Sequence, residues 1–428
     1  MRKRPRRQSA KRTIIILATA VALLTVLVLA ARSYRAAPLI EPETPEMLAK
    51  RLAPDNAYHA LLALADDLPD RPTRSGPFSL GVLRRRGALL ALELGIRRPD
   101  DDPEVVQYIE ATRPIAAAVA AVLEEQSYLC APIDSLDANT EALDAFHNLA
   151  RILGGHALHA AQRGDAEDAM RFSLAGLKLG KAVASDGPLE NFLKGSSMID
   201  QCAIWAMCLP WDRYAEEELR AFLRALDALD PADLDICAAF DWELRLIEAG
   251  AYASSESAQR SGLRERLKDA ALRRFARKGI DNVREAAQLS HAELQTWSSQ
   301  HQRLRGVEHE LLPTRLISGV ENAVIARTNT ATHADALRAL VALDLYHKTH
   351  GVYPETLDAL TPEFLDTVPI DAYAAAPLRY SPKNGSYTMY SIGPSGQDDG
   401  GDPKNDYLFP PPLAEPFQAT LEDPDTDT

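Results

Sequence analysis

Apolar residues recur at steps of three and four through most of the chain, from about residue 46 to residue 330. Over residues 146–160 and 169–180 this spacing places them on one face of a helix, and Gly164 and Asp165 between the two stretches form a turn signal. The pattern predicts a helical hairpin whose two helices pack together. Further helices are expected near residues 190–208, 215–228, 233–252, 261–278 and 283–304.

Small residues at Ala157, Ala169 and Gly176 give this hairpin a weakly tetratricopeptide-like spacing. The pattern does not recur about 34 residues later, as it would in a repeat array. The sequence therefore predicts a mainly α protein with an irregular helical ectodomain over residues 49–329.

The pattern changes near residue 330. An amphipathic helix over 330–346 leads into turn-rich sequence with short β-like runs at 378–380, 387–392 and 407–409. This predicts a small α+β domain over residues 330–409 with a three-stranded antiparallel sheet. Residues 410–428 are rich in proline and acids and have little to bury, so we expect a disordered acidic tail.

The N-terminal residues show a different pattern. Residues 1–13 carry seven Lys or Arg and no acid, and residues 14–31 contain no charge. Eighteen apolar residues approach the length that spans a bilayer, and the positive flank predicts a cytoplasmic N-terminus. We expect a single-pass inner-membrane anchor at 14–31, a proline-containing stalk at 32–48, and the bulk of the chain in the periplasm or otherwise outside the cytoplasm. A cleaved signal peptide is the alternative.

Charge sharpens this picture. The formal net charge is −14, and without the seven N-terminal cations 40 basic residues stand against 61 acidic ones. Such a balance gives no reason to expect a nucleic-acid partner, and 46% apolar residues exclude a collagen-like or wholly disordered chain. Residues 258–278 form a basic amphipathic pattern, which would lie on anionic lipid or present a solvated cationic face.

One acidic stretch is a candidate cation site. Four carboxylates within nine residues repel one another unless a cation lies between them, and the intervening glycines let the backbone wrap around an ion. Calcium, which takes six to eight oxygen ligands, suits such a flexible loop. The candidate ligands are Asp398, Asp399, Asp402 and Asp406. A solvated acidic loop without a metal is the alternative.

Several spaced motifs near the C-terminus resemble the C-terminal domain of the major pseudopilin of type II secretion. In order they are Ala342–Tyr346, Gly351–Pro354, Val368–Asp371, Pro377–Tyr380 and Tyr390–Gly396. The resemblance covers about 80 residues and implies a calcium loop. It assigns ligand duty to the acidic residues above and to an oxygen near Ser391.

Two departures limit the resemblance. Ser395 stands where the family has aspartate, which removes one oxygen donor, and residues 14–31 lack the family's glutamate and preceding glycine cleavage point. Pilus-like polymerisation is therefore not expected. The rest of the chain resembles membrane-anchored helical envelope proteins of bacteria, and that resemblance supplies no activity.

Histidine pairs offer weaker candidates. His156 and His159, and likewise His347 and His350, are three residues apart and can share a helix face. Zinc normally needs a third protein ligand, which neither pair has nearby. We interpret His156 as a packed helix residue.

The chain has four cysteines, Cys130, Cys202, Cys208 and Cys237. If Cys202 and Cys208 share a helix, about 9 Å of axial rise separates them, which is too far for a disulfide. A bridge from Cys130 or Cys237 to one of them, or four free thiols, both remain open.

No glycine-rich phosphate loop and no complete catalytic signature is visible. We therefore expect a non-enzymatic, membrane-anchored extracytoplasmic protein of interaction or assembly type, linked to secretion or envelope organisation. Its expected partners are the lipid bilayer, through residues 14–31, and another envelope protein; no small-molecule substrate is identified. The alternative is an extracytoplasmic hydrolase with an unlocated active site.

Overall fold

The computed structural model describes residues 43–69, 103–131, 133, 136–249, 284–286, 288–290, 293, 313–383 and 385–411. The expected membrane span at 14–31, the basic pattern at 258–278 and the tail beyond residue 411 lie outside these ranges. Within them, none of the helices is both long enough and apolar enough to cross a membrane.

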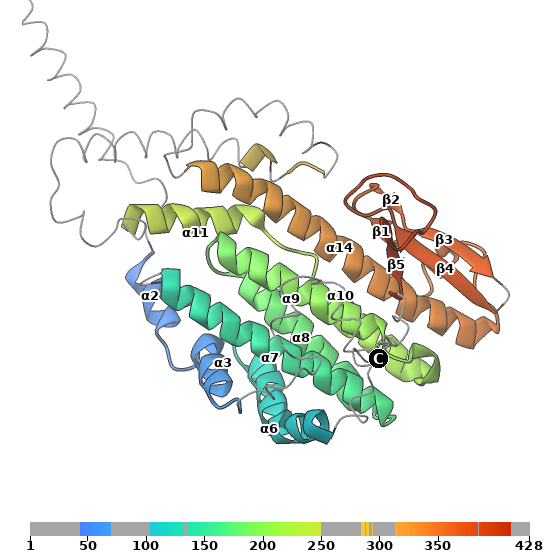
Figure 1. The fold of residues 1–428 in the computed structure, drawn as a ribbon, viewed down its shortest axis with the longest axis horizontal. Helices are drawn as coiled ribbons and strands as arrows, with labels where there is room; N and C mark the ends of the chain where they lie inside the picture. Colours follow the sequence, from blue (N-terminus) through green and yellow to red (C-terminus); the bar gives the residue numbers. More distant parts are fainter. Residues whose placement is uncertain are drawn as a thin grey trace, which may run out of the picture.

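The described part of the chain is mainly helical, as predicted, and Figure 1 shows the helices packed side by side. The α-helices are α2 (Pro45–Arg51), α3 (Ala57–Asp66), α6 (Pro103–Glu125), α7 (Leu136–Gln162), α8 (Ala166–Ser185), α9 (Leu189–Met207), α10 (Glu216–Leu229), α11 (Ile236–Ala249) and α14 (Pro313–His350). Short 3-10 helices are η2 (Trp211–Arg213) and η4 (Leu357–Leu360).

The predicted hairpin is formed by α7 and α8. Gly164 adopts a φ of +75°, which favours glycine, and lets the chain reverse. The next residue, Asp165, begins α8 because its side chain accepts a hydrogen bond from the backbone N–H of Asp168. The turn is therefore encoded locally by two adjacent residues.

Helix α9 packs closely against both helices of the hairpin. A Cβ atom on Gly154 of α7 would lie 1.8 Å from the Trp205 ring, and one on Gly195 of α9 would lie 2.3 Å from the backbone nitrogen of Ala184. These contacts require glycine, since any side chain would push the helices apart. The three helices form the centre of one hydrophobic core, which extends from α3 to the C-terminal strands.

Helix α14 is longer than the sequence predicted. It begins at Pro313 rather than Thr330, so the expected domain boundary at 329/330 falls inside a continuous helix. The missed stretch contains Gly319, a weak helix former in isolation. In the folded chain Val320, Ala323 and Val324 of this stretch are buried in the hydrophobic core. Burial in the core thus stabilises a helix that the local sequence pattern did not predict.

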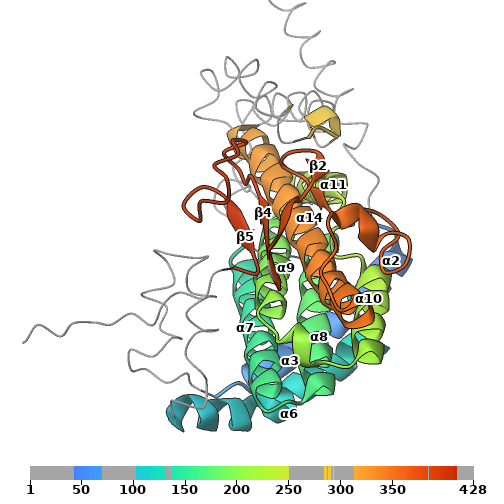
Figure 2. The same cartoon turned by 90° about the vertical axis from the view of Figure 1, so that its right-hand side faces the viewer.

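The C-terminal sheet confirms the predicted three-stranded antiparallel arrangement. Strand β3 (Arg379–Lys383) pairs with β4 (Ser386–Ser391), which pairs with β5 (Tyr407–Phe409). A two-stranded ladder of β1 (Ile370–Asp371) and β2 (Ala376–Pro377) precedes it. Figures 1 and 2 show the strands lying along α14. The buried side chains of Met389 and Phe409 join the core.

One difference from the predictions concerns the N-terminal part of the ectodomain. Helix α2 begins at Pro45, inside the expected stalk, because Thr44 caps it through the N–H of Met47. The four cysteines are free, which is one of the two possibilities that the sequence left open. Cys202, for example, packs against Gly176 of α8.

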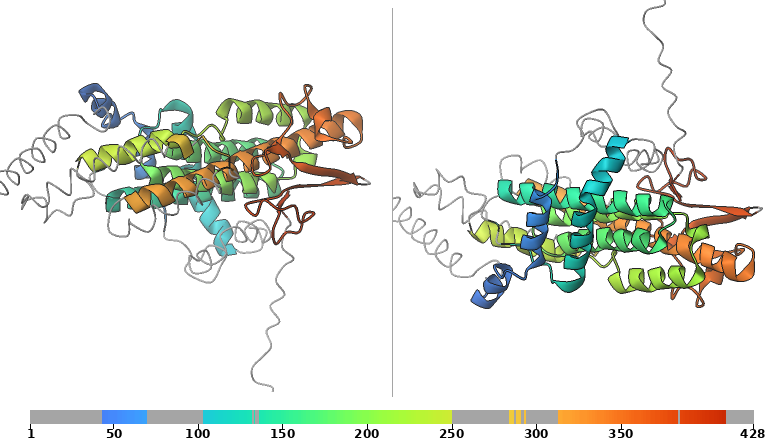
Figure 3. Two further views of the ribbon diagram at one scale, coloured as in Figure 1. Left: turned by 90° about the horizontal axis from the view of Figure 1, so that it is seen from above. Right: turned by 90° about the horizontal axis from the view of Figure 1, so that it is seen from below.

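The molecule is elongated along the helix direction. Helix α2 and the C-terminal end of α14 lie at opposite ends of it (Figures 1 and 3). Any attachment of the chain near α2 would therefore place the end of α14 far from the attachment point.

Candidate functional site

The predicted acidic loop is built from glycine turns around exposed carboxylates. Gly400 and Gly401 have φ values of +73° and +83°, which allow the tight reversal. Asp399 and Asp402 are exposed, whereas Asp406 is buried with 3% of its surface accessible. Among the described residues, no three His, Cys, Asp or Glu side chains converge as a metal-binding group.

Asp398 already has a cation of its own. Arg379 Nε donates to Asp398 Oδ2 at 2.9 Å, and the Tyr390 hydroxyl donates to Oδ1 at 3.0 Å. The hydrogen bond from Arg379, followed by those from the Gly400 N–H and Tyr390, lowers the pKa of Asp398 below its usual value. This carboxylate is therefore neutralised from within the sheet.

Asp406 differs from Asp398 in having an oxygen with no partner. Its Oδ2 accepts a hydrogen bond from the Gly401 N–H at 2.7 Å. Its Oδ1 is buried and accepts no hydrogen bond from the described residues. A buried carboxylate oxygen normally has a donor or a cation beside it. Asp406 thus fits the predicted cation loop, and Asp398 does not.

Ser391, the remaining predicted ligand, is used elsewhere. Its hydroxyl donates to Asp371 Oδ1 at 2.8 Å and accepts from the Gly393 N–H at 3.0 Å. Asp371 is fully buried and also accepts from the N–H groups of Ile392 and Tyr373. This pair ties β1 to the end of β4.

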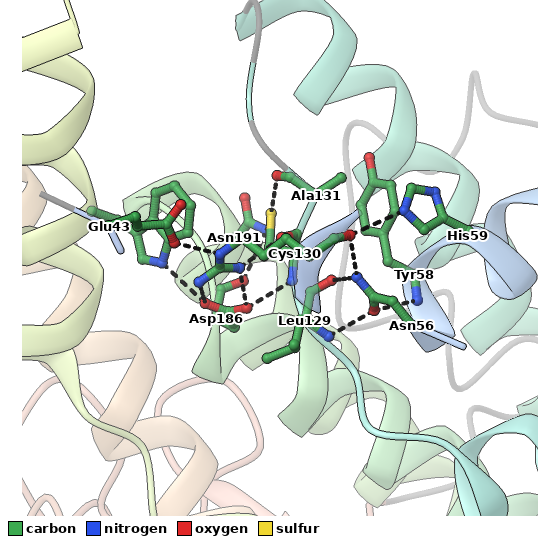
Figure 4. A network of polar contacts seen from close by, with 11 residues as sticks. Glu43, Asn56, Tyr58, His59, Leu129, Cys130, Ala131, Asp186 and Asn191 are labelled. Atoms are coloured by element: carbon green, nitrogen blue, oxygen red, sulfur yellow. Dashed lines mark hydrogen bonds and ion pairs between the residues drawn. The ribbon is translucent and has the colours of Figure 1, made fainter. Parts of the chain in front are cut away.

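A second polar cluster lies in the bundle and was not predicted. We call it the Arg51 network; it consists of Glu43, Arg51, Cys130, Asp186 and Trp242 (Figure 4). Arg51 is the last residue of α2 and is 5% exposed. Its guanidinium binds both oxygens of Asp186, at 2.7 and 3.0 Å, and lies over the Trp242 ring at 4.6 Å.

The network joins segments that are distant in the sequence. Asp186 caps the C-terminus of α8 and accepts further hydrogen bonds from the Cys130 N–H at 2.7 Å and from Trp242 Nε1 at 3.0 Å. Arg51 also donates to Glu43 and, at 2.6 Å, to the Cys130 carbonyl. The Arg51 guanidinium donates four hydrogen bonds and the carboxylate of Asp186 accepts four, so the cluster ties α2, α8, α11 and the segment after α6 together.

Electrostatics agree with a structural role for this network. Burial lowers the pKa of Arg51, but the hydrogen bonds and charges of Asp186 and Glu43 outweigh that effect and raise the pKa. Burial, followed by the charge of Asp186, raises the pKa of the Cys130 thiol to about 12. The thiol stays protonated at neutral pH and is therefore a poor nucleophile.

Asn56 extends the same arrangement toward α3. Its amide nitrogen donates to the carbonyls of Arg51 and Leu129, at 3.0 and 2.6 Å. Its amide oxygen accepts from the N–H groups of Leu129 and Tyr58. Figure 4 shows this side chain between α3 and the segment that carries Cys130. All four hydrogen-bonding positions of one buried amide are used.

A third cluster lies where α9 and α14 meet the C-terminal strands. Asp200 Oδ1 is 3.1 Å from Thr330 Oγ1 and 3.2 Å from His333 Nδ1. The His333 ring stacks on Tyr407, which meets the Tyr373 ring edge to face. Ser391 hydrogen-bonds to one carboxylate, Asp371, whereas His333 contacts another, Asp200. Ser391 and His333 therefore do not share an acidic partner and do not form a Ser–His–acid triad.

Three of the four paired histidines, His156, His347 and His350, pack against aromatic rings. His156 is buried, lies 3.1 Å from the Thr112 hydroxyl through Nε2, and packs on Phe172. Burial lowers its pKa to about 4. His347 and His350 stack on Tyr353 and Tyr346 near the end of α14.

Comparison with known proteins adds no relative. No protein-family model, no curated protein and no solved structure matches this chain.

Proposed function

We propose that this chain is a membrane-anchored platform outside the cytoplasm, of non-enzymatic interaction or assembly type, which binds another envelope protein. Residues 14–31 cross the inner membrane once, and residues 1–13 remain in the cytoplasm. The observation that supports this proposal is the Arg51 network. It fastens the segment that follows the apolar run to the interior of the helical bundle.

A rigid attachment matters for a platform because it fixes which faces of the bundle point away from the membrane. A flexible stalk would let the bundle tumble and would lower the effective concentration of any one surface. Here Arg51 connects α2 to α8 through Asp186 and to α11 through Trp242. The described chain therefore enters the bundle at one fixed place, helix α2.

We also propose that calcium stabilises the acidic loop. Asp406 is the principal ligand, and Asp399 and Asp402 are the further carboxylates; the unpartnered Oδ1 of Asp406 supports this assignment. When bound, the ion supplies positive charge between carboxylates that otherwise repel one another. Asp398 takes no part because Arg379 already neutralises it.

The platform proposal is tested in whole cells and spheroplasts. Externally added protease should digest the bundle but leave an N-terminal tag intact. Photo-crosslinkers in place of exposed Arg163 and Arg224 should give discrete adducts with an envelope protein. A cytoplasmic bundle, or the absence of adducts from every surface tested, would contradict the proposal. Hydrolysis of an ester or peptide that is lost in His333→Gln would favour the hydrolase alternative, because His333 and Asp200 form an acid–histidine pair.

A further inference from the structure

Strand β5 connects the acidic loop to the helical bundle. Asp406, the principal ligand of the proposed calcium site, is followed directly by Tyr407, the first residue of β5. The ring of Tyr407 stacks on the ring of His333 on α14, with 5.6 Å between the ring centres. His333 Nδ1 in turn lies 3.2 Å from a carboxylate oxygen of Asp200 on α9. Two adjacent residues thus link the loop to α14 and, through His333, to α9.

The C-terminal strands are held on the bundle in two ways. Near β1, the backbone N–H groups of Ile370 and Ala372 donate to side chains of α14. Strand β5, at the edge of the three-stranded sheet, contacts α14 through two rings, Tyr407 and Phe409, which both lie against His333 (Figure 1). A gap of about 0.5–1 Å removes a quarter to a half of the dispersion attraction between such groups. A small displacement of β5 would therefore weaken its contact with α14 while the attachment near β1 persisted.

The position of β5 depends on the turn that precedes it. The carbonyl oxygen of Asp402 accepts hydrogen bonds from the N–H groups of Asn405 and Asp406, at 3.0 and 2.8 Å. Asp406 Oδ2 accepts from the Gly401 N–H, whereas its buried Oδ1 has no hydrogen-bond partner among the described residues. Without a cation this oxygen is desolvated and unpaired, which disfavours the turn. A cation held by Asp402 and Asp406 would remove that cost and hold both ends of the turn.

We propose that a cation bound by Asp402 and Asp406 fixes β5 against α14, so that occupancy of the acidic loop determines how firmly the edge of the C-terminal sheet is held on the bundle. This inference rests on the proposed calcium site. The rings of Tyr407 and His333 transmit the effect, because Tyr407 is the neighbour of Asp406 in the chain. His333 is a positioning residue and takes no part in binding the ion.

The coupling must act in both directions. If calcium favours the position in which β5 contacts His333, then contacts that favour this position must strengthen calcium binding by the same factor. Loss of the His333 ring should lower the fraction of molecules in that position, and with it the apparent affinity for calcium. A merely structural role for His333 would leave the affinity unchanged, since position 333 lies outside the loop.

Calorimetric titration of the full chain in detergent with calcium chloride tests this link. The variant His333→Gln keeps an amide that can donate to Asp200 but removes the ring on which Tyr407 stacks. The matched control is His350→Gln, because His350 lies on the same helix and stacks on a different ring, that of Tyr346. The wild type and His350→Gln should bind calcium with the same affinity, and His333→Gln should bind it at least about five-fold more weakly.

Amide hydrogen exchange in the wild type gives a second readout, measured by mass spectrometry with and without saturating calcium. Exchange in peptides that contain β5 should become several-fold slower when calcium is added. Peptides that contain β1 are the internal control, and their exchange should stay the same, because hydrogen bonds to α14 hold this segment independently of the loop.

The calcium site and the coupling fail in different ways. Absence of heat in the wild type would remove the calcium site, and this inference with it. Heat in the wild type with equal affinities in His333→Gln and His350→Gln would overturn the coupling and leave the calcium site in place, and so would unchanged exchange of β5 at saturating calcium. If His333→Gln does not fold, the exchange measurement on the wild type decides alone.

Discussion

The Arg51 network and the acidic loop are two charged clusters with opposite relations to the sequence. The carboxylates of the loop lie within nine residues, yet the structure leaves Asp399 and Asp402 exposed and gives Asp398 an internal cation. Arg51 and Asp186 are 135 residues apart and form a buried, bidentate pair. Density of charge along a sequence thus says little about where the fold depends on charge.

The difference follows from the cost of removing ions from water. An exposed carboxylate keeps its hydration and needs no partner, so its neighbours are weakly constrained. A buried guanidinium has lost its hydration and must find acceptors in fixed positions. The energetic consequence of losing one charge should therefore follow burial.

Loss of Arg51 should have the largest effect. Arg51→Met leaves the carboxylate of Asp186 without its cation, and breaking a buried pair in this way costs about 3–5 kcal/mol. We expect a drop of that size in the free energy of unfolding, measured by urea denaturation, and loosening of α2. Lys50→Met, which removes an exposed charge from the same helix, is the matched control and should change the stability little.

The double variant Arg51→Met with Asp186→Asn separates charge from packing. Removing the second charge should recover part of the lost stability, because the uncompensated carboxylate is gone. If Arg51→Met unfolds as easily as Lys50→Met, the contrast between buried and exposed charge is wrong for this protein.

Asp344, on α14, is half-buried, between the buried Arg51 and the exposed carboxylates of the acidic loop. Its ionisation should make the stability depend on pH. It accepts a hydrogen bond from the Tyr353 hydroxyl at 3.0 Å, and burial raises its pKa to about 6. The folded state therefore binds a proton more tightly than the unfolded state. The resulting stability is fully present below about pH 4 and is lost as the pH rises through 6, by at most about 3 kcal/mol.

Urea unfolding at pH 4 and pH 7.5 measures this loss. Asp344→Asn should flatten that part of the pH dependence, because an amide cannot ionise. Asp358→Asn, at an exposed position in η4, should leave it as in the wild type. The same pH slope in Asp344→Asn as in the wild type would show that another group titrates.

The acidic loop should give the smallest effect. Without calcium, Asp398→Asn removes the charge of an exposed side chain but keeps an oxygen that can accept a hydrogen bond, so the Tm should stay nearly constant. Millimolar calcium should raise the Tm of the wild type and of Asp398→Asn but not of Asp406→Asn, because the unpartnered oxygen belongs to Asp406. Calorimetric titration is the direct measurement. Absence of heat and of a thermal shift in the wild type would remove calcium from the proposal.

The sequence predicts those elements whose signals are local. The hairpin of α7 and α8 has a clear apolar period and a glycine–aspartate turn, and the three strands near the C-terminus are each bounded by turn residues. The start of α14 was not predicted because residues 313–329 include a glycine, Gly319, and pack as a helix only against the core, where Val320, Ala323 and Val324 are buried. Helix α2 had a usable signal, since Thr44 followed by Pro45 is a capping residue with proline at the first helical position.

The Arg51 network had no such signal. Arg51 ends a short helix beside an ordinary lysine, and Asp186 follows a serine at a helix end. Neither position has a neighbour that suggests burial, and the pairing exists only once α2, α8 and α11 meet. The acidic loop shows the reverse: its residues were easy to find, but which carboxylate is neutralised depends on Arg379, a residue of β3.

The continuity of α14 has a consequence for how the molecule can vary. One helix carries both the surface that packs on α9 and the residues that contact the C-terminal strands. Insertion of a single residue within it would turn everything that follows by about 100° and advance it by about 1.5 Å. The number of residues in α14 therefore sets how the contacts with the sheet are oriented relative to the contacts with α9. Lengthening of this helix is tolerated in whole turns, or else must be matched by changes in both halves of the protein.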